Sequence, residues 1–540
     1  MDSFTAKAIE LGVAEPNPIV MNGMAGETLK KAEEYLNEVF KAIKTFPEEL
    51  EYLGYERCTP LQEAFEVTKP KNNKRTYDLA KSTIYLTKFK FAYKGKPLLE
   101  RHIYLPYTED AGVMYLGGGM FHIVPVLSDK VITNNYNVVF LRLLRDKMIV
   151  RKLHHFVFVN GVRYPDIVVY ADIYRTKDTK VQKTTKAVTC FAHYLFAQYG
   201  LTETFIKFLG FKPILGKEEI NSKNYPTKDW SIISCSGVKP NTCLDKVYET
   251  STLRMAIPKD KWDSNTKSLV MGFFYIVDHF PDRFTDLDDT SYLDNPDIWK
   301  VLLGHIVFSG VFAENKLYQD IEEHFTSLSD YLDPMAKHKL KCLGYDVNNI
   351  YELFALVAMK FKDFTGSSNN SRDSLYNKNI EVLYWTLYNI TASIFKTVFK
   401  LRRRTQKKDI TEKDIIEIFN KELRTGIVFS LSSGKVVTET VDYSGDHKFI
   451  DLTSKMNEQE SMPSNDREKA NKRLNPGPAM YVNPYKMEVG QVLYLSKSNP
   501  DPLNRINPYL NLDPVDGTIR RNEDLRELLE ATEKRLLLKD

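Results

Sequence analysis

The chain has 540 residues, of which 43% are hydrophobic and 12% aromatic, so it is long enough for roughly two to four globular domains. Its net charge of only +4 excludes nucleic-acid binding through bulk charge, so any such role must rest on local patches. The five cysteines are scattered without a CxxC pair, which argues against a disulfide framework or a zinc ribbon and fits a reducing compartment.

The N-terminal region begins without the apolar segment of a signal peptide, and we expect a soluble intracellular protein. In residues 26–46, apolar side chains such as Leu29, Leu36 and Phe40 recur at helical spacing, which predicts an amphipathic surface helix. Residues 1–80 are therefore predicted to form a segment of helix and linker.

The pattern then changes to that of strands. Residues 82–93 alternate aromatic and lysine side chains and predict a half-buried strand, and residues 100–107 predict its return partner. The pair Asn160 and Gly161 predicts a hairpin, because both residue types adopt the positive φ of a type I′ turn. We expect residues 81–265 to form a mixed, β-rich region.

Helical patterns dominate further along. Residues 185–210 predict a helix, and residues 266–430 predict a mainly helical region. The longest pattern, residues 376–401, places apolar side chains on one face but carries charges that argue against a membrane span. A further helix begins at Thr411, with Asp414 three residues on as in a capping box. The fold class predicted for the whole chain is therefore α+β and multidomain.

Two groups of cations lie on these elements, in residues 136–152 and in residues 402–408. The first group could contact phosphates, although a solvated face is the default interpretation of such a charge run. The second group complements the dipole at the end of its helix and adds solubility.

No motif of a self-contained active site is present. Asp286, Asp288 and Asp289 could ligate a divalent cation, but the offsets of an EF-hand loop are missing, and capping of the helix predicted at 296–308 is the favoured interpretation. The glycines at 117–119 lack the spacing of a phosphate-binding loop, so we expect a tight turn that feeds a strand at 121–126.

Residues 431–519 are predicted to be a long irregular, loop-rich region, and Pro and Asn are concentrated in residues 471–518. A segment of this length and character is either functional or a linker, and its interleaved tyrosines favour function. Candidate phosphate partners are Lys472, Arg473, Lys497 and Arg505, and candidate polar contacts to sugars or bases are Asn504 and Asn507. Residues 520–540 predict an amphipathic helix that docks on the chain itself or on another subunit.

Three segments carry a resemblance to a known family. Residues 105–132 contain a GxFxI strand and a later basic-Val-Ile run, made here by Gly119, Phe121, Ile123, Lys130, Val131 and Ile132. Residues 288–295 keep a DDxxxLxN spacing through Asp288, Asp289, Leu293 and Asn295. Residues 472–504 contain Lys472-Arg473-Leu474, Gly477, Val482-Asn483-Pro484, Pro500-Asp501 and Asn504.

In this order, the three segments resemble the N-terminal half of the β subunit of multisubunit DNA-dependent RNA polymerase. The chain departs from that family's pattern at Ser291 and Tyr292, where the family has Asp-His, and it lacks several of the family's glycines. A chain that ends soon after these segments is similar to the split β subunits of giant, phiKZ-like bacteriophage polymerases.

The resemblance implies a fold and a role. Residues 80–265 would form protrusion-like and lobe-like parts beside the DNA, the helical region 300–430 would return to the protrusion, and residues 471–511 would be a fork loop facing the RNA–DNA hybrid. The chain would bind no cofactor itself, and Mg²⁺ would be held by a partner subunit that carries the catalytic residues of nucleotidyl transfer.

The implied partners are the other polymerase subunits, namely the C-terminal β part and the β′ parts, together with the DNA template and the RNA–DNA hybrid, and no membrane. The implied location is the host bacterial cytoplasm, a phage compartment or the virion. One alternative is a phage structural or assembly protein, favoured by the Tyr-, Asn- and Pro-rich loops. Another is a free-standing nucleic-acid enzyme that uses the aspartates at 286–289.

Overall fold

The computed structural model describes most of the chain up to residue 423 and short segments beyond it. The described residues are 6, 17–21, 24–44, 46–68, 81–98, 100–109, 112–116, 119–123, 125–135, 137–143, 147–174, 186–238, 251–285, 289–308, 313–366, 374–405, 409–423, 429–430, 435–436, 449–451, 461–463, 490–493, 503–506, 510–513, 517–520, 523, 527 and 534.

The chain divides into two compact units. Unit 1 consists of residues 1–130, 333–335 and 372–540, and unit 2 consists of residues 131–332 and 336–371. Unit 2 is therefore inserted, in chain order, between the two halves of unit 1. Helices occur in both units, with several separate sheets in the described part of unit 1 and one large sheet in unit 2, which confirms the predicted α+β, multidomain class.

The N-terminal half of unit 1 is built on an antiparallel sheet in which β2 is central. Its strands are β1 (Leu50–Arg57), β2 (Ile84–Tyr93), β3 (Lys96–Pro97) and β4 (Arg101–Pro106). Helix α4 (Ala32–Ala42) packs Phe40 against this sheet, with ring centroids 5.0 Å from Tyr52 and 5.1 Å from Phe89. The strands predicted at 82–93 and 100–107 are thus confirmed, although β2 is buried along most of its length and not half-buried as predicted. The helix predicted at 26–46 is present as successive helical pieces that end at Ala42.

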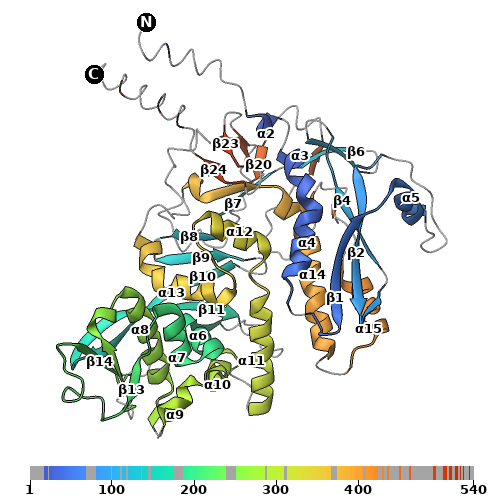
Figure 1. Cartoon of the computed structure of the whole chain (residues 1–540). Coiled ribbons are helices and arrows are strands. Elements are labelled where there is room, and N and C mark those ends of the chain that lie inside the picture. The colour runs from blue at the N-terminus through green and yellow to red at the C-terminus, as the bar shows by residue number, and fades with distance from the viewer. Residues whose placement is uncertain are drawn as a thin grey trace. The chain divides into compact units, whose positions relative to one another are not determined.

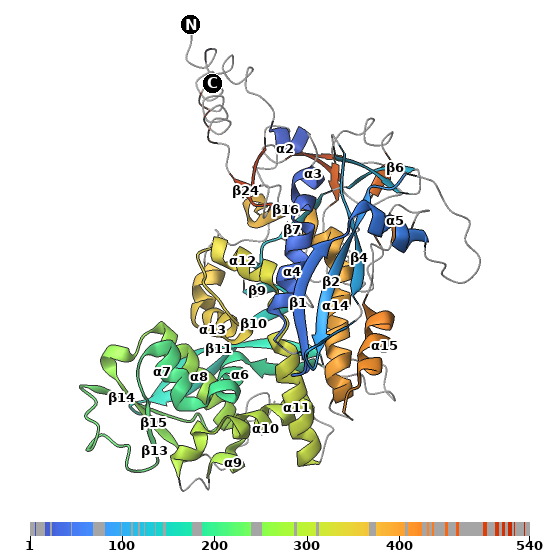
Figure 2. The ribbon, with the colours of Figure 1, turned by 45° about the vertical axis from the view of Figure 1, so that its right-hand side comes forward.

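The C-terminal half of unit 1 contributes two helices, α14 (Leu383–Thr405) and α15 (Glu412–Glu422). Figures 1 and 2 both show α14 beside α4. The ring of Phe419 lies 4.9 Å from that of Phe91 in β2, and the hydroxyl of Tyr93 donates to the carbonyl of Ile410 at 2.6 Å. The two halves therefore share one core.

Two paired strands of unit 1 flank the segment of the chain that forms unit 2. Strand β7 (Val126–Asp129) pairs antiparallel with β16 (Lys378–Glu381), so that Asp129 lies opposite Lys378. Nζ of Lys378 and Oδ1 of Asp129 are 2.8 Å apart, and the buried hydroxyl of Ser128 donates to Glu381 at 2.6 Å. The chain thus enters and leaves unit 2 at neighbouring positions.

Shorter elements complete unit 1. Its other helices are α2 (Pro18–Met21), α3 (Met24–Thr28), η1 (Leu29–Lys31), α5 (Pro60–Thr68) and η6 (Leu375–Asn377). Its other strands are β5 (Val113–Leu116), β6 (Gly119–Ile123), β17 (Phe429–Ser430), β18 (Lys435–Val436), β19 (Phe449–Asp451), β20 (Ser461–Pro463), β21 (Gly490–Leu493), β22 (Leu503–Ile506), β23 (Asn511–Leu512) and β24 (Ile519–Arg520).

Unit 2 is organised on an eight-stranded antiparallel sheet with the path β12-β11-β10-β14-β15-β13 and with β9 and β8 attached to β10. The strands are β8 (Ile132–Asn135), β9 (Val138–Arg142), β10 (Lys147–Val159), β11 (Val162–Tyr174), β12 (Lys186–Cys190), β13 (Ile214–Gly216), β14 (Trp230–Ser234) and β15 (Arg254–Pro258). The predicted hairpin turn is confirmed, with positive φ values of 51° at Asn160 and 79° at Gly161.

Helices bury the core of unit 2 against this sheet. They are α6 (Phe191–Tyr199), α7 (Leu201–Leu209), η3 (Lys259–Lys261), α8 (Ser264–His279), α9 (Pro281–Thr285), η4 (Thr290–Asp294), α10 (Pro296–Val307), α11 (Glu314–Ser329) and α13 (Ile350–Gly366). Helix α12 (Pro334–Cys342) begins in the short unit 1 segment 333–335 and continues in unit 2. Fully buried aromatic side chains such as Phe191 and Phe354, whose rings stack 4.5 Å apart, form the centre of this core. None of the helices within the described residues is sufficiently long and apolar to cross a bilayer.

Three predicted elements differ from the observed ones. The helix predicted from residue 376 begins at Leu383, because the backbone of residues 378–381 pairs with β7. The helix predicted at 185–210 begins at Phe191 after strand β12 and is interrupted at Gly200. The strand predicted at 121–126 is divided between β6 and β7 at Pro125, which has no N–H to donate.

Candidate nucleic-acid interface

Four of the six predicted contact residues, Lys472, Arg473, Lys497 and Asn507, lie outside the described residues. The other two, Asn504 and Arg505, lie in β22, which is the middle strand of a small sheet between β20 and β21. Asn504 lies opposite Met462 and Val492, and Arg505 lies opposite Ser461 and Gln491. Both residues are therefore placed on paired backbone, whereas the sequence pattern predicts irregular loop.

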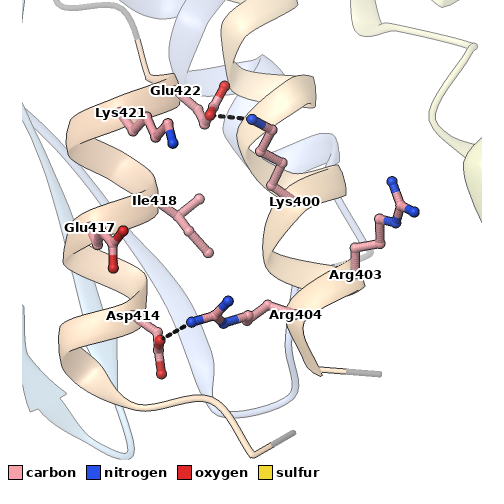
Figure 3. Close-up of a pocket in the computed structure, with 8 residues that line it drawn as sticks. All are labelled: Lys400, Arg403, Arg404, Asp414, Glu417, Ile418, Lys421 and Glu422. Atoms are coloured by element: carbon pink, nitrogen blue, oxygen red, sulfur yellow. Dashed lines mark hydrogen bonds and ion pairs between the residues drawn. The ribbon is translucent and has the colours of Figure 1, made fainter. Parts of the chain in front are cut away.

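From the cationic group at residues 402–408, Arg403 and Arg404 line a groove of about 380 Å³ between α14 and α15 (Figure 3), and residues 406–408 lie outside the described residues. The lining side chains are Lys400, Arg403, Arg404, Asp414, Glu417, Ile418, Lys421 and Glu422. Helix α14 lines the groove with three cations, and α15 lines it with three carboxylates and Lys421, so the net charge of the lining is small.

Ion pairs between α14 and α15 neutralise some of these charged side chains. Arg404 Nη2 lies 3.0 Å from Asp414 Oδ1, and Lys400 donates to the carboxylate of Glu422. The Lys400 ammonium lowers the pKa of Glu422 below its usual range, mainly through that hydrogen bond. These contacts hold α15 against α14, and they leave two of the cations unavailable for phosphates.

Arg403 and Lys421 remain exposed, and within the described part of the chain neither forms an ion pair. Figure 3 shows the Arg403 side chain directed away from α15. The guanidinium of Arg402 lies 5.7 Å from the ring centroid of Phe399 on its own helix. Within the described part of the basic run, Arg404 therefore pairs α14 with α15, and Arg403 and the nearby Lys421 of α15 are the candidates for phosphate contact.

Of the three aspartates that could ligate a cation, the structure describes only Asp289. Asp289 Oδ1 accepts the N–H of Ser291 at 2.9 Å as the N-cap of η4, and the Ser291 hydroxyl lowers the pKa of this carboxylate. Asn295 caps α10 by accepting the N–H of Asp297 at 3.0 Å. Asp286 and Asp288 lie outside the described residues. Among the residues that are described, no group of three or more His, Cys, Asp or Glu side chains could hold a metal ion.

A buried polar network in unit 2 has no counterpart among the sequence predictions. The carboxylate of Asp278 accepts the hydroxyl and the N–H of Ser236, at 2.7 and 3.1 Å, and Nε2 of His155 lies 3.0 Å from its Oδ2. The carboxylate lies between the serine and the histidine, so the histidine cannot deprotonate the hydroxyl as in a hydrolase triad. The network ties β10, α8 and the segment after β14 together. Its only sequence signal is a single acidic residue at the end of an apolar helix.

One comparison with known proteins gives a match. The family model described as "Non-virion RNA polymerase subunit" matches residues 12–534, nearly the whole chain. No curated protein matches the sequence.

Proposed function

This chain belongs to the family of non-virion RNA polymerase subunits, and we propose that within the enzyme it forms the N-terminal part of the β subunit. In this role it shapes the channel for DNA and RNA and contacts the template and the hybrid during viral transcription. The observation that carries the proposal is the family match together with the order of the three β-like segments, at residues 105–132, 288–295 and 472–504.

The connectivity of unit 1 supports the proposal. The resemblance implies that a helical region returns to the protrusion after the lobe has been completed. In this chain, residues after 372 return to the unit begun by residues 1–130, where Arg101 Nη2 donates to the carbonyl of Phe419 at 3.1 Å. Such likeness of connectivity supports a role by analogy, and the site residues need their own test.

The proposed division of labour places catalysis on a partner chain. The Mg²⁺-binding residues of nucleotidyl transfer would lie on another subunit, and this chain would supply side chains that hold the nucleic-acid backbone. The proposed contacts are those of Lys472, Arg473, Lys497 and Arg505 with phosphates and those of Asn504 and Asn507 with sugars or bases. Phosphate contacts position the strands and read no sequence. The enzyme would act in the infected bacterial cell.

Assembly tests the subunit role. We expect a tagged copy of this chain, isolated from infected cells, to bring down the other polymerase chains in fixed proportion and with transcription activity. Omission of the chain from a reconstituted enzyme should abolish that activity, and the chain alone should not polymerise nucleotides. Recovery of the chain in virions without any polymerase chain would contradict the proposal.

The assembled enzyme also tests the proposed fork loop. The double variant Arg473→Ala and Arg505→Ala should retain nucleic acid more weakly, and its log–log salt slope should fall by roughly 0.7 to 0.9 for each phosphate that the variant no longer neutralises. The matched control is Arg283→Ala, which removes an exposed cation from α9 and should leave the slope unchanged. Unchanged retention and transcription in the double variant would contradict the assignment of these two residues.

A further inference from the structure

Two aromatic side chains of unit 2 lie off its core. Phe156 and Phe158 occupy alternate positions of β10, so their side chains lie on one face of the sheet. Their rings meet edge to face, with centroids 5.9 Å apart and planes at 89°. Val157, between them, is fully buried on the opposite face, whereas both phenylalanines are half-buried and neither belongs to the hydrophobic cluster formed by the described residues of this unit.

Cations surround this aromatic pair. The exposed Arg163 lies opposite Phe158 in the β10–β11 register, and its guanidinium carbon is 4.1 Å from the ring centroid of Phe156. Lys152 and His154 occupy the preceding positions of the same face. The residues opposite these positions in β11 are Val169, Ile167, Pro165 and Arg163, and none of them is acidic. Val169 is buried in the core of unit 2 and Ile167 packs against it, so the open part of this face lies around Phe156, Phe158 and Arg163.

A third strand holds the hairpin in place. Asn160, at the turn, donates its N–H to the carbonyl of Ile232 at 2.7 Å, and its side-chain oxygen accepts the N–H of Ile232 at 2.9 Å. Strand β14 also pairs Ser234 with Phe158. Behind this surface, the network of His155 and Asp278 anchors β10 to α8. The aromatic pair is therefore presented on a fixed scaffold, which reduces the entropy lost when a ligand is bound.

We propose that this face, defined by Phe156, Phe158 and Arg163 and named here the hairpin platform, binds unpaired bases of single-stranded nucleic acid. The inference rests on the proposed function, which brings melted DNA and new RNA to the enzyme. Bases stack on aromatic rings and on guanidinium planes, and nearby cations neutralise the phosphates between them. The basic flank favours this polyanion over an apolar protein segment, which would leave Arg163 and Lys152 without a complementary charge.

Binding by the full-length chain tests the platform without any variant. The probes are a fluorescent oligothymidylate and an abasic phosphodiester chain of the same length, compared by fluorescence anisotropy at one salt concentration. Stacking of one base strengthens binding by about fivefold to a hundredfold, so the oligothymidylate should bind at least fivefold more tightly. Equal affinities for the two probes would overturn the proposal, and would also be the result for a surface that serves a protein partner.

Variants then locate the site. Phe158→Leu keeps an apolar side chain but removes the ring, so it should weaken oligothymidylate binding about fivefold or more and leave abasic binding unchanged. Arg163→Gln should weaken both. The matched control Tyr292→Leu removes an aromatic ring that is 61% exposed elsewhere in unit 2 and should change neither. An unchanged melting temperature of each variant shows that folding is intact.

The outcomes separate this inference from the subunit role. If Phe158→Leu binds oligothymidylate as the wild type does, the platform is wrong even when the variant assembles into an active polymerase. If the chain never assembles with polymerase chains but shows the stacking preference, the subunit role is wrong and the site stands as a single-strand binding surface.

Discussion

Gly517 shows how one residue attaches the C-terminal part of unit 1. Its φ is +69°, its carbonyl accepts the N–H of Ile380 at 2.8 Å, and a Cβ at this position would lie against the carbonyl oxygen of Ile380. Both the backbone conformation and the close approach therefore require glycine. The sequence does not reveal this requirement, because the residue that makes the space tight lies far away in the chain.

Gly517→Ala should accordingly release residues 517–520 from β16. Left-handed backbone alone costs an alanine about 1–2 kcal/mol, and the clash adds to it. The measurement is hydrogen exchange at the amide of Ile380, which should lose protection. Gly344→Ala is the matched control, because Gly344 has φ +84° but open space around its Cβ position. If Gly517→Ala and Gly344→Ala had equal effects, the close approach of residue 517 to the carbonyl oxygen of Ile380 would contribute nothing to the requirement for glycine.

Two histidines make unit 2 sensitive to acid, of which His193 is fully buried and His324 is half-buried. Burial lowers the pKa of His193 to about 3 and that of His324 to about 4. Nε2 of His193 lies 2.9 Å from the carbonyl oxygen of Trp299, to which the neutral ring donates. Below the usual histidine pKa of about 6.5, the unfolded chain binds protons that the folded chain does not, so stability present above pH 6.5 is lost as the pH falls.

The expected loss in the free energy of unfolding is about 1.4 kcal/mol per pH unit for each histidine, or about 2 kcal/mol each between pH 6.5 and 5. Denaturant unfolding of unit 2, followed by tryptophan fluorescence at pH 7.5 and 5, measures it. His338→Gln, at an exposed position, should leave the pH dependence unchanged. Stability that is constant between pH 7.5 and 5 would contradict the buried, neutral state of both rings.

At the scale of elements, α15 shows both what local sequence predicts and what it leaves out. The capping box at its start is confirmed: Thr411 Oγ1 accepts the N–H of Asp414 at 3.3 Å, and Asp414 Oδ2 accepts the N–H of Thr411 at 3.1 Å. Near its other end, the carbonyl of Phe419 and the side chain of Asn420 accept from Arg101, a buried residue of β4. No local pattern indicates this second contact.

Arg101→Met should loosen α15, because the carbonyl of Phe419 would stay buried without a donor. Hydrogen bonds from a charged group contribute about 1.5–3 kcal/mol each, and we expect the free energy of unfolding of unit 1 to fall by about 2–4 kcal/mol. Thermal unfolding and hydrogen exchange of α15 amides measure the change. Lys96→Met, at an exposed position of β3, is the control and should have an effect of less than about 0.5 kcal/mol.

Two of the errors in the sequence predictions have a common physical cause. Residues 378–381 fit the apolar stripe of the helix that follows, yet they pair with β7, and residues 186–190 likewise pair with β11 instead of starting a helix. Tertiary pairing overrides local periodicity in both cases. In the candidate interface, the sequence does not show that cations of α14 are paired, because the acidic residues that pair with them lie on α15.

At the scale of the whole molecule, the insertion of unit 2 predicts that it can be excised. Lys130 donates its N–H to the carbonyl of Asn377 at 3.0 Å, so the ends of the excised segment are adjacent. We expect the rest of unit 1 to fold when residues 131–376, which include unit 2 and the short unit 1 segments 333–335 and 372–376, are replaced by a two-residue turn such as Asn-Gly. Buried Trp385 would then be the single tryptophan and should show blue-shifted emission that is lost cooperatively on heating. Emission typical of a solvated indole would contradict the independence of unit 1.

The pairing of β7 with β16 also has a consequence for biosynthesis. The ribosome must complete all of unit 2 before β16 emerges, which takes on the order of tens of seconds at about 5–20 residues per second. Throughout that interval Phe91 and its neighbours in β2 have no α15 to cover them, whereas unit 2 has its whole sequence by the end of it. The nascent chain is therefore expected to finish its inserted unit first, and its first-made strands are the part on which a chaperone would act.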